Sequence, residues 1–279
     1  MTGTVMLVVL FAAALHASWN ALVKSGSDKF MDAVLIAAGS ALLGLVLLPF
    51  LPVPDPASWP FAAASGLLQV VYFGLLSAAY RTGDMSVVYP LMRGAAPLLV
   101  AAAAVFLLDE HPGPGGWAGI ALISCGVLGL ALTAGRRGAG PAPVLFALAN
   151  AAVIASYTTV DGIGARLSGN VASYTFWILG LPAVPLLLWA AWRRARDLRA
   201  QFLQRWHLAL LGGACSLGAY ALALWAMTQA PIALVAALRE TSILFGVALA
   251  GLVLKERLGW TRIAAAGTVA LGVVALRLA

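Results

Sequence analysis

The sequence predicts an all-α polytopic membrane protein with ten transmembrane helices, arranged as two inverted five-helix repeats. Three observations support this fold class. The composition is too apolar for a water-soluble surface, ten separate apolar runs are long enough to span a bilayer, and the second half of the chain repeats the first. No long polar stretch interrupts the runs, so we expect no soluble domain.

The composition excludes a water-soluble protein. Of the 279 residues, 62% are hydrophobic and 10% are charged, and the mean hydropathy is +0.97. Soluble domains carry about 25% charged residues. The net charge of +7 is explained by basic loops that orient the spans, so no nucleic-acid partner is expected. Cys125 and Cys215 lie in different apolar runs without metal-ligand spacing, which indicates buried free thiols.

Ten apolar runs can each cross a bilayer, which requires about 20 residues per helix. Segments rich in Pro, Gly or charge separate several of them, for example 52–56, 111–116 and 136–141. No basic segment precedes the first run, which we interpret as a retained span rather than a signal peptide. The predicted spans are 4–23, 31–51, 59–80, 85–108, 116–134, 142–160, 171–192, 206–227, 231–254 and 259–277.

An internal repeat relates the two halves of the chain. The clearest corresponding pairs are Arg93 with Arg239, Glu110 with Glu256, and Trp117 with Trp260. More faintly, Ala17-Ser18-Trp19 matches Ala155-Ser156-Tyr157. Each unit holds an odd number of spans, so the halves must have opposite orientations, as in secondary transporters whose site lies between the halves. The predicted division is a first repeat over 1–134, a linker over 135–141 and a second repeat over 142–279.

The distribution of basic residues predicts which loops face the cytoplasm. Most of the 17 Lys and Arg residues lie in loops that follow odd-numbered spans, and the densest cluster is Arg193, Arg194 and Arg196. The loops and the terminus on the other side carry Arg166 and Arg277. The positive-inside rule then places the odd-numbered loops in the cytoplasm and both termini outside.

Two arginines lie deep inside predicted spans. Arg93 in the fourth span and Arg239 in the ninth are each about 12 Å from the start of their helix, near the middle of a hydrocarbon core about 30 Å thick. A charge at that depth is costly and usually faces a cavity or a partner. The pair could hold a carboxylate or phosphonate in a central cavity, since a guanidinium suits such anions. Alternatively, Glu240, Asp161 or backbone carbonyls could neutralise both arginines.

Glu240 is the only acid well inside a predicted span, because Asp161 lies at the end of the sixth run. A carboxyl group at that depth could carry the proton of an antiporter. It could equally be the partner of an arginine on another helix. Adjacent helical residues point about 100° apart, so we expect Glu240 not to neutralise Arg239 directly.

Polar and aromatic residues are further candidates for the wall of the cavity. His16 and Asn20 share one face of the first span, with Trp19 beside them. Their alternative role is hydrogen bonding to a neighbouring helix. A metal site is not expected, because no other His, Cys or acid lies near His16 at zinc spacing. The deep aromatic candidates, which would suit an amphiphilic solute, are Trp19, Tyr72, Tyr89, Tyr157 and Tyr220.

The fourth span carries two prolines around its arginine. Pro90 and Pro97 bracket Arg93, and proline frees a backbone carbonyl and kinks a helix. In a membrane such a gap is tolerated where it faces a cavity or a packed neighbour. The fourth span is therefore predicted to be a gating helix. Close helix packing is expected at the small residues Gly39, Gly44, Gly126 and Gly129.

Several segments resemble the EamA branch of the drug/metabolite transporter superfamily. They are His16–Lys24 in the first span and the span-end acids within 107–110 and 253–257, and the ten spans and inverted repeat resemble it too. The resemblance covers the whole chain. It implies a carrier of the bacterial inner membrane, and most such carriers export amino acids and other small metabolites. Arg93 and Arg239 replace the apolar or small residues of many exporters, which disfavours a purely hydrophobic substrate.

We therefore expect a secondary transporter of a small anionic or zwitterionic, amino-acid-like metabolite that works by alternating access. Export is favoured by the resemblance alone. The alternatives are a flippase for a lipid-linked or amphiphilic phosphate-bearing molecule and an importer of a phosphonate-like solute. The residues expected to contact substrate are Arg93, Arg239, Glu240, His16, Trp19, Asn20, Tyr89 and Tyr157.

An enzyme is not expected, because no catalytic constellation occurs at useful spacing. No cofactor is expected, and proton coupling stays open. The expected partners are the small-molecule substrate and the lipid bilayer, and a monomer would suffice for transport.

Overall fold

The structure is a computed structural model that describes residues 1–26, 28–134, 140–252 and 259–278. In these ranges every regular element is a helix, and ten helical segments are long and apolar enough to cross a membrane. This confirms the predicted fold class. The ninth crossing consists of two shorter helices, α9 and α10. The helices are α1 (Gly3–Lys24), α2 (Lys29–Leu47), α3 (Trp59–Thr82), α4 (Met85–Leu108), α5 (Pro114–Ala134), α6 (Pro141–Leu167), α7 (Val171–Arg193), α8 (Ala195–Gln229), α9 (Ile232–Arg239), α10 (Ser242–Leu252) and α11 (Trp260–Leu278), with 3-10 turns η1 (Leu48–Phe50) and η2 (Pro56–Ser58).

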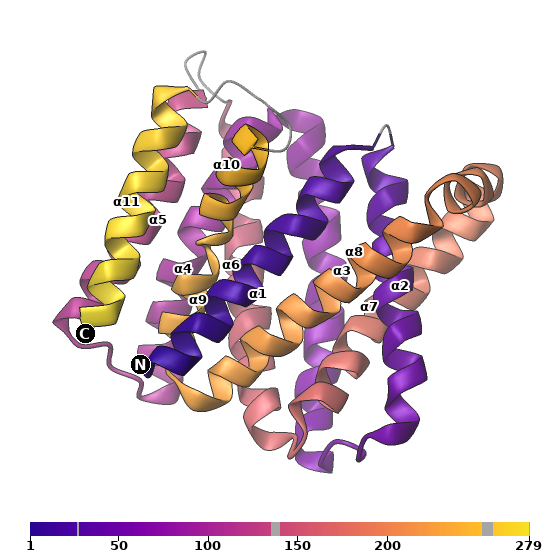
Figure 1. The fold of residues 1–279 in the computed structure, drawn as a ribbon, viewed down its shortest axis with the longest axis horizontal. Helices are drawn as coiled ribbons and strands as arrows, with labels where there is room; N and C mark the ends of the chain where they lie inside the picture. The colour runs from indigo at the N-terminus through magenta and orange to yellow at the C-terminus, as the bar shows by residue number, and fades with distance from the viewer. Residues whose placement is uncertain (27, 135–139, 253–258, 279) are drawn as a thin grey trace.

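The helices form one bundle to which each half of the chain contributes five crossings (Figure 1). The first half supplies α1–α5 and the second half α6–α11. The N and C termini lie at the same side of the bundle (Figure 1), as an even number of crossings requires. Because five is odd, the second half enters from the side opposite the first, which is the inverted arrangement.

Two parts of the sequence predictions fall on residues that are not described. The predicted linker, 135–141, lies mostly in the gap between 134 and 140. Glu256, the repeat counterpart of Glu110, lies in the gap between 252 and 259. The same two gaps contain four of the basic residues behind the predicted orientation, namely Arg136, Arg137, Lys255 and Arg257. The linker and the orientation stay predictions.

Side-chain caps fix where several helices begin. Thr2, Asp28, Asp84 and Asn170 each accept a backbone N–H from the first turn of α1, α2, α4 and α7, respectively. These caps satisfy amides that have no partner within the helix. At the other end of α4, Asp109 adopts a left-handed backbone conformation with φ 53°, which turns the chain out of the helix.

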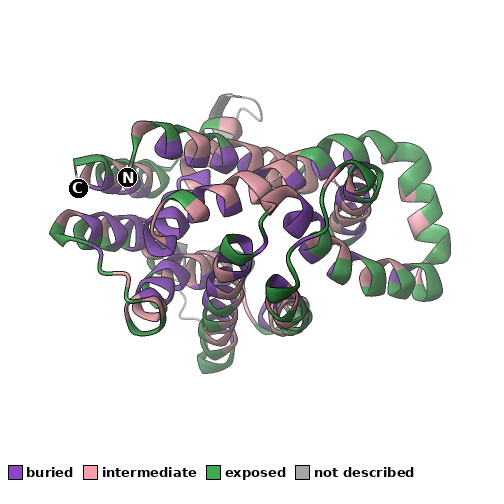
Figure 2. Ribbon diagram, turned by 90° about the horizontal axis from the view of Figure 1, so that it is seen from below, coloured by how far each residue is buried: buried purple, intermediate pink, exposed green. Residues whose placement is uncertain are grey.

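The outside of the bundle is apolar and the acids within it are buried, as a lipid-facing protein requires. Figure 2 shows buried residues on the inward faces of the helices and exposed residues around the periphery. Asp32, Asp161 and Glu240 are among the buried polar residues. The exposed large hydrophobic side chains include Phe11, Leu45, Leu67, Phe106, Leu188 and Leu271. Such a surface is stable only against lipid or another apolar partner.

Glycines bring two pairs of helices into close contact, and both pairs join the two repeats. Between α2 and α8, a Cβ on Gly39 would lie 1.7 Å from the carbonyl oxygen of Ala209. Between α5 and α11, a Cβ on Gly126 would lie 2.8 Å from a methyl group of Val269. Small residues allow such approach of helix backbones in membranes. Gly129 does not have this role, because nothing lies within 4 Å of its Cβ position, so its prediction was wrong.

A cluster of ion pairs joins the repeats near the start of α8. This helix begins at Ala195, before the predicted span, and has one non-helical residue, Arg205, at the predicted boundary. Arg205 donates to the buried carboxylate of Asp32 on α2. Arg194 pairs with Asp28 at 2.6 Å. Partial burial acts to raise the pKa of Asp28, but an α2 backbone amide and Arg194 hold it below its usual range.

Gly39→Ala is expected to destabilise the protein, because the new methyl group would collide with the Ala209 carbonyl oxygen, a backbone atom that cannot rotate away. Overpacking of this kind costs about 1–3 kcal/mol, although alanine is otherwise the better helix former. Thermal unfolding of the purified protein in detergent should therefore occur at a lower temperature than for the wild type.

Gly267→Ala on the exposed face of α11 is the matched control, since nothing lies within 4 Å of its Cβ position. Equal melting temperatures for the Gly39 and Gly267 variants would contradict the close contact between α2 and α8.

Candidate functional site

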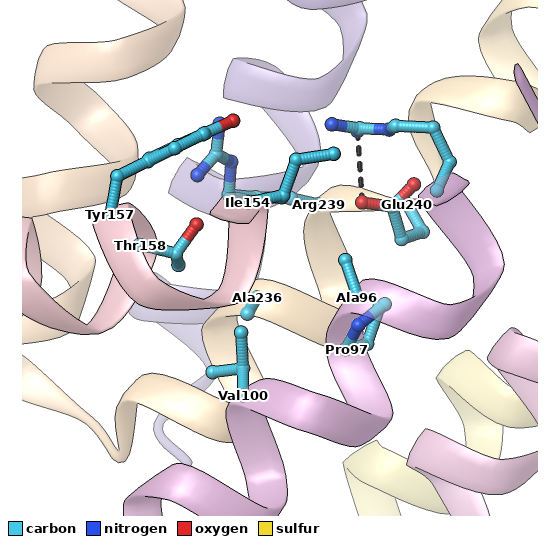
Figure 3. Close-up of a pocket in the computed structure, with 10 residues that line it drawn as sticks. Ala96, Pro97, Val100, Ile154, Tyr157, Thr158, Ala236, Arg239 and Glu240 are labelled. Carbon is cyan, nitrogen blue, oxygen red and sulfur yellow. Dashed lines mark ion pairs between the residues drawn. The ribbon is translucent and has the colours of Figure 1, made fainter. Parts of the chain in front are cut away.

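A pocket lies between the two repeats. Its charged residues are at one end, whereas Ala96, Val100 and Ala236 form an apolar end (Figure 3). Both repeats contribute to the lining: α4 provides Arg93, Ala96, Pro97 and Val100, α6 provides Ile154, Tyr157 and Thr158, α9 provides Ala236 and Arg239, and Glu240 follows directly after α9. Arg93 and Arg239, which occupy equivalent positions in the two repeats, therefore line the same pocket.

Arg93 and Glu240 form an ion pair across the boundary between the repeats. Their Nη2 and Oε1 atoms are 2.8 Å apart, and the side chains are 12% and 5% exposed (Figure 3, dashed line). The sequence left open whether a bound solute or Glu240 neutralises the charge of the arginines. Glu240 forms its ion pair with Arg93, which lies on the opposite half of the chain.

Glu240 lies at a break in the ninth crossing. The helix α9 ends directly before it, and α10 begins after Thr241. The amides of Glu240 and Thr241 donate to the carbonyls of Ala237 and Leu238, three residues back, so the helix tightens for one turn. The Thr241 hydroxyl also donates to the Leu238 carbonyl at 2.7 Å. Short tightened turns within helices are often functional hinges.

The interrupted crossing is not the one that the sequence singled out. We predicted a gating helix at the fourth span from its two prolines, but α4 stays helical through both Pro90 and Pro97. Proline removes one hydrogen bond without requiring the helix to end. The break at Glu240 has no proline or glycine beside it, so no local signal marks it in the sequence. A gating role of α4 stays a prediction.

Arg239 enters the pocket without an ion pair to any of the residues that the structure describes. Its guanidinium carbon lies 5.2 Å from the centre of the Tyr220 ring on α8, which is a cation–π contact. The formal charges in the lining are +1 for Arg93, +1 for Arg239 and −1 for Glu240, which leaves one net positive charge. A concave site with surplus positive charge attracts anions.

Tyr157 is the aromatic residue of the lining. Its ring meets Tyr72 of α3 edge to face, with the centroids 6.1 Å apart. Tyr89 of α4 packs with both tyrosines around an apolar cluster that contains Met92 and Ala96, but it does not line the pocket. The structure therefore places one of the two predicted tyrosines in the pocket and the other in the adjoining layer.

His16, Trp19 and Asn20 on α1 are not part of the pocket lining. Trp19 packs against an apolar cluster formed by α2 and α8, and its ring meets the His16 ring at 5.1 Å. The side-chain amide of Asn20 donates to the backbone carbonyl of His16 at 2.8 Å, within the same helix. The structure thus gives these residues local contacts, and their predicted contact with substrate stays untested.

Asp161 is more deeply placed than the sequence suggested. We predicted that the sixth span ends at residue 160, but α6 continues to Leu167, and Asp161 is fully buried within it. The acid and the nearby glycines interrupt the apolar pattern, which shortened the predicted span. No proline lies between Asp161 and Arg166, and this absence of a helix-breaking residue could have extended the predicted span to Arg166.

Glu110 joins the repeats at the end of α4. Its carboxylate accepts hydrogen bonds from Arg166 at 2.6 Å and from the backbone amide of Ile232, the first residue of α9, at 2.8 Å. Arg166 also donates to the carbonyls of Met227 and Ala230 at the end of α8. A carboxylate is favourable at a helix N-terminus. The acid that helped to reveal the repeat therefore also anchors the start of α9.

Comparison with known proteins agrees with the two-repeat architecture. The profile of the EamA-like transporter family matches the chain twice, over residues 3–132 and 142–278. No match was found among curated proteins. Among the solved structures, 27 chains match. One of them, titled "Crystal structure of protein", is 17% identical with a TM-score of 0.75, and the alignment covers 100% of this chain and 98% of that chain. At this identity the likeness shows the fold alone.

Arg93→Gln and Glu240→Gln should each destabilise the protein, because each leaves a buried charge without its partner. Breaking a buried pair in this way costs about 3–5 kcal/mol. The double variant should be more stable than the sum of the two single effects predicts, since it leaves two neutral amides. Thermal or denaturant unfolding in detergent measures all four proteins as a double-mutant cycle. Additive losses would show that the two residues are not coupled.

Proposed function

Because the chain belongs to the EamA-like transporter family, whose members are membrane transporters of the drug/metabolite superfamily, we propose that it carries a small anionic or zwitterionic, amino-acid-like metabolite. The observation that supports this is the charge balance of the pocket. Glu240 neutralises Arg93 at 2.8 Å, whereas Arg239 contacts the Tyr220 ring and has no ion pair within the described ranges. A carboxylate or phosphonate at Arg239 would restore neutrality in a site where net charge is costly.

The pocket has a charged end and an apolar end, and this difference in polarity supports the same class of substrate. An acidic group at Arg239 would leave an apolar side chain near Ala96, Val100 and Ala236 at the other end (Figure 3). Tyr157 would cover the substrate between the two ends.

The position of the pocket suits transport by alternating access. Its lining comes from both repeats, and in carriers built from inverted repeats the halves move about a site between them. The Arg93–Glu240 pair connects those halves, and Glu240 sits in the tightened turn between α9 and α10. An anion at Arg239 would therefore bind next to a hinge, where it can alter the balance between two arrangements.

We further place the carrier in the bacterial inner membrane, with the odd-numbered loops in the cytoplasm and both termini outside. The basic residues along the sequence support this orientation. The direction of transport is a separate question, because the family resemblance alone favoured export. The ligand class distinguishes the alternatives, since a flippase would require a lipid-linked phosphate and an importer a soluble phosphonate at Arg239.

Arg239→Gln is expected to lower the uptake of anionic substrates by roughly 10–100-fold, the loss that corresponds to one charge-assisted hydrogen-bonding partner. The purified protein is reconstituted in proteoliposomes and offered glutamate, phenylalanine and methylphosphonate. Phenylalanine amide, which lacks the carboxylate, is offered in parallel. Uptake of each labelled compound is measured over time, and thermal stabilisation of the detergent-solubilised protein by each compound gives a second readout.

Arg199→Gln is the matched control, because it makes the same chemical change at an exposed position on α8. Wild-type rates of anion uptake by Arg239→Gln would refute the anion site. Equal uptake of phenylalanine and its amide by the wild type would refute it as well.

A further inference from the structure

Asp161 is a buried carboxyl group that does not line the pocket. It lies on α6 and is 0% exposed. The Tyr220 hydroxyl of α8 donates to its Oδ2 atom, while Oδ1 has no hydrogen-bond partner. No ion pair to Asp161 occurs among the described residues. A carboxylate in an apolar interior must be paired with a cation or take up a proton. The question is therefore which of the two neutralises Asp161.

The surroundings of Asp161 favour a proton. The helix α3 contributes Ser65, whose hydroxyl accepts from Gln69 at 3.3 Å, and neither group is charged. The described residues contain no group of three His, Cys, Asp or Glu side chains that could hold a metal ion. The turn η2, which also contacts α6, carries no titratable side chain. The titratable or charged groups near Asp161 are Tyr157 of α6, Tyr174 of α7, Tyr220 of α8 and Arg239 of α9, and α4 adds Arg93, which is paired with Glu240.

Tyr220 connects Asp161 to the pocket. Its hydroxyl donates to Asp161, and the Arg239 guanidinium carbon lies 5.2 Å from the centre of its ring. Asp161 and Arg239 therefore both contact the same aromatic side chain, one at its hydroxyl group and the other at the face of its ring. An ionised Asp161 attracts the guanidinium and competes with a substrate anion for it. A protonated Asp161 leaves Arg239 available to the anion.

We propose that Asp161 is the site of the coupling proton, and that the carrier moves the proton and the anion together. The anion half of this statement rests on the proposed function. Protonation of Asp161 removes a negative charge beside Arg239, so proton binding and anion binding strengthen each other, and this linkage is reciprocal. Glu240, which the sequence suggested as a proton carrier, is already neutralised by Arg93.

Asp161 also bears on the symmetry of the repeats and on the direction of transport. When Ala17 is aligned with Ala155, the position equivalent to Asp161 in the first repeat is Val23, so the first repeat has no matching acid there. Joint binding of proton and anion means symport, which drives uptake wherever protons flow into the cell. The assignment thus favours import over the export that the family resemblance suggested.

The proton itself can be detected without any substrate. The wild type and Asp161→Asn are reconstituted in lipid and compared by infrared spectroscopy in buffers of increasing pH. The wild type and Glu240→Gln should both show the C=O stretching band of a protonated carboxylic acid at neutral pH, and Asp161→Asn should lack it. Asp161→Glu should retain a protonated carboxyl band and serves as the second variant if Asp161→Asn does not fold. Absence of the band from the wild type, or its persistence in Asp161→Asn, would overturn the assignment.

Coupling is tested in vesicles that contain a pH-sensitive dye, with glutamate, phenylalanine and methylphosphonate as probes. The wild type should acidify the vesicle interior when an accepted anion is added outside. Asp161→Asn should still exchange the anion across the membrane but should neither acidify the interior nor accumulate the anion. Acidification equal to that of the wild type would overturn the proposal. If no probe crosses with the wild type, the proposed substrate class fails, while the infrared band still decides whether Asp161 holds a proton.

Discussion

The structure depends on keeping charges neutral inside an apolar bundle, and the ion pair between Arg93 and Glu240 is the central instance. Within the described parts of the chain, an acid of one half meets a base of the other half at four places. These are Arg93 with Glu240, Asp28 with Arg194, Asp32 with Arg205, and Glu110 with Arg166. Buried pairs add little net stability, but a group that loses its partner is strongly unfavourable. The pairs therefore fix how one half sits against the other more than they hold either half together.

This constraint explains why Arg239 and Asp161 are the informative exceptions. Each is a charged or titratable group within a membrane span, and neither has an ion pair among the described residues. Both contact the side chain of Tyr220. A stable protein can tolerate such groups when a bound ligand or a proton neutralises their charge for part of the time. The proposed binding of an anion and of a proton rests on these two groups.

The sequence predicted the features that depend on periodicity and composition. The ten spans, the inverted halves and the depth of Arg93 and Arg239 follow from apolar runs of the right length and from matching positions. The partner of Glu240 did not follow, because the contact joins residues far apart in the chain and depends on how α4 and α9 face each other. The break after Arg239 has no proline or glycine to mark it. The sequence analysis placed Asp161 at the end of a span, because an acid with neighbouring glycines has the same composition as the loop that follows a span. Tyr220 was a candidate by depth, but only the packing of α6 on α8 brings it to Asp161.

The contact between α5 and α11 also bears on how such a chain can arise. With Trp117 aligned to Trp260, Gly126 aligns with Val269, and these two residues touch each other. A position that contacts its own equivalent lies on a two-fold axis, as in an isologous dimer. Two identical five-span chains, inserted in opposite directions, would meet in the same way. Joining them into one polypeptide removes the requirement that both halves be the same, and a single acid opposite Val23 becomes possible. Asymmetry at Asp161 is therefore something that a pair of identical chains cannot have.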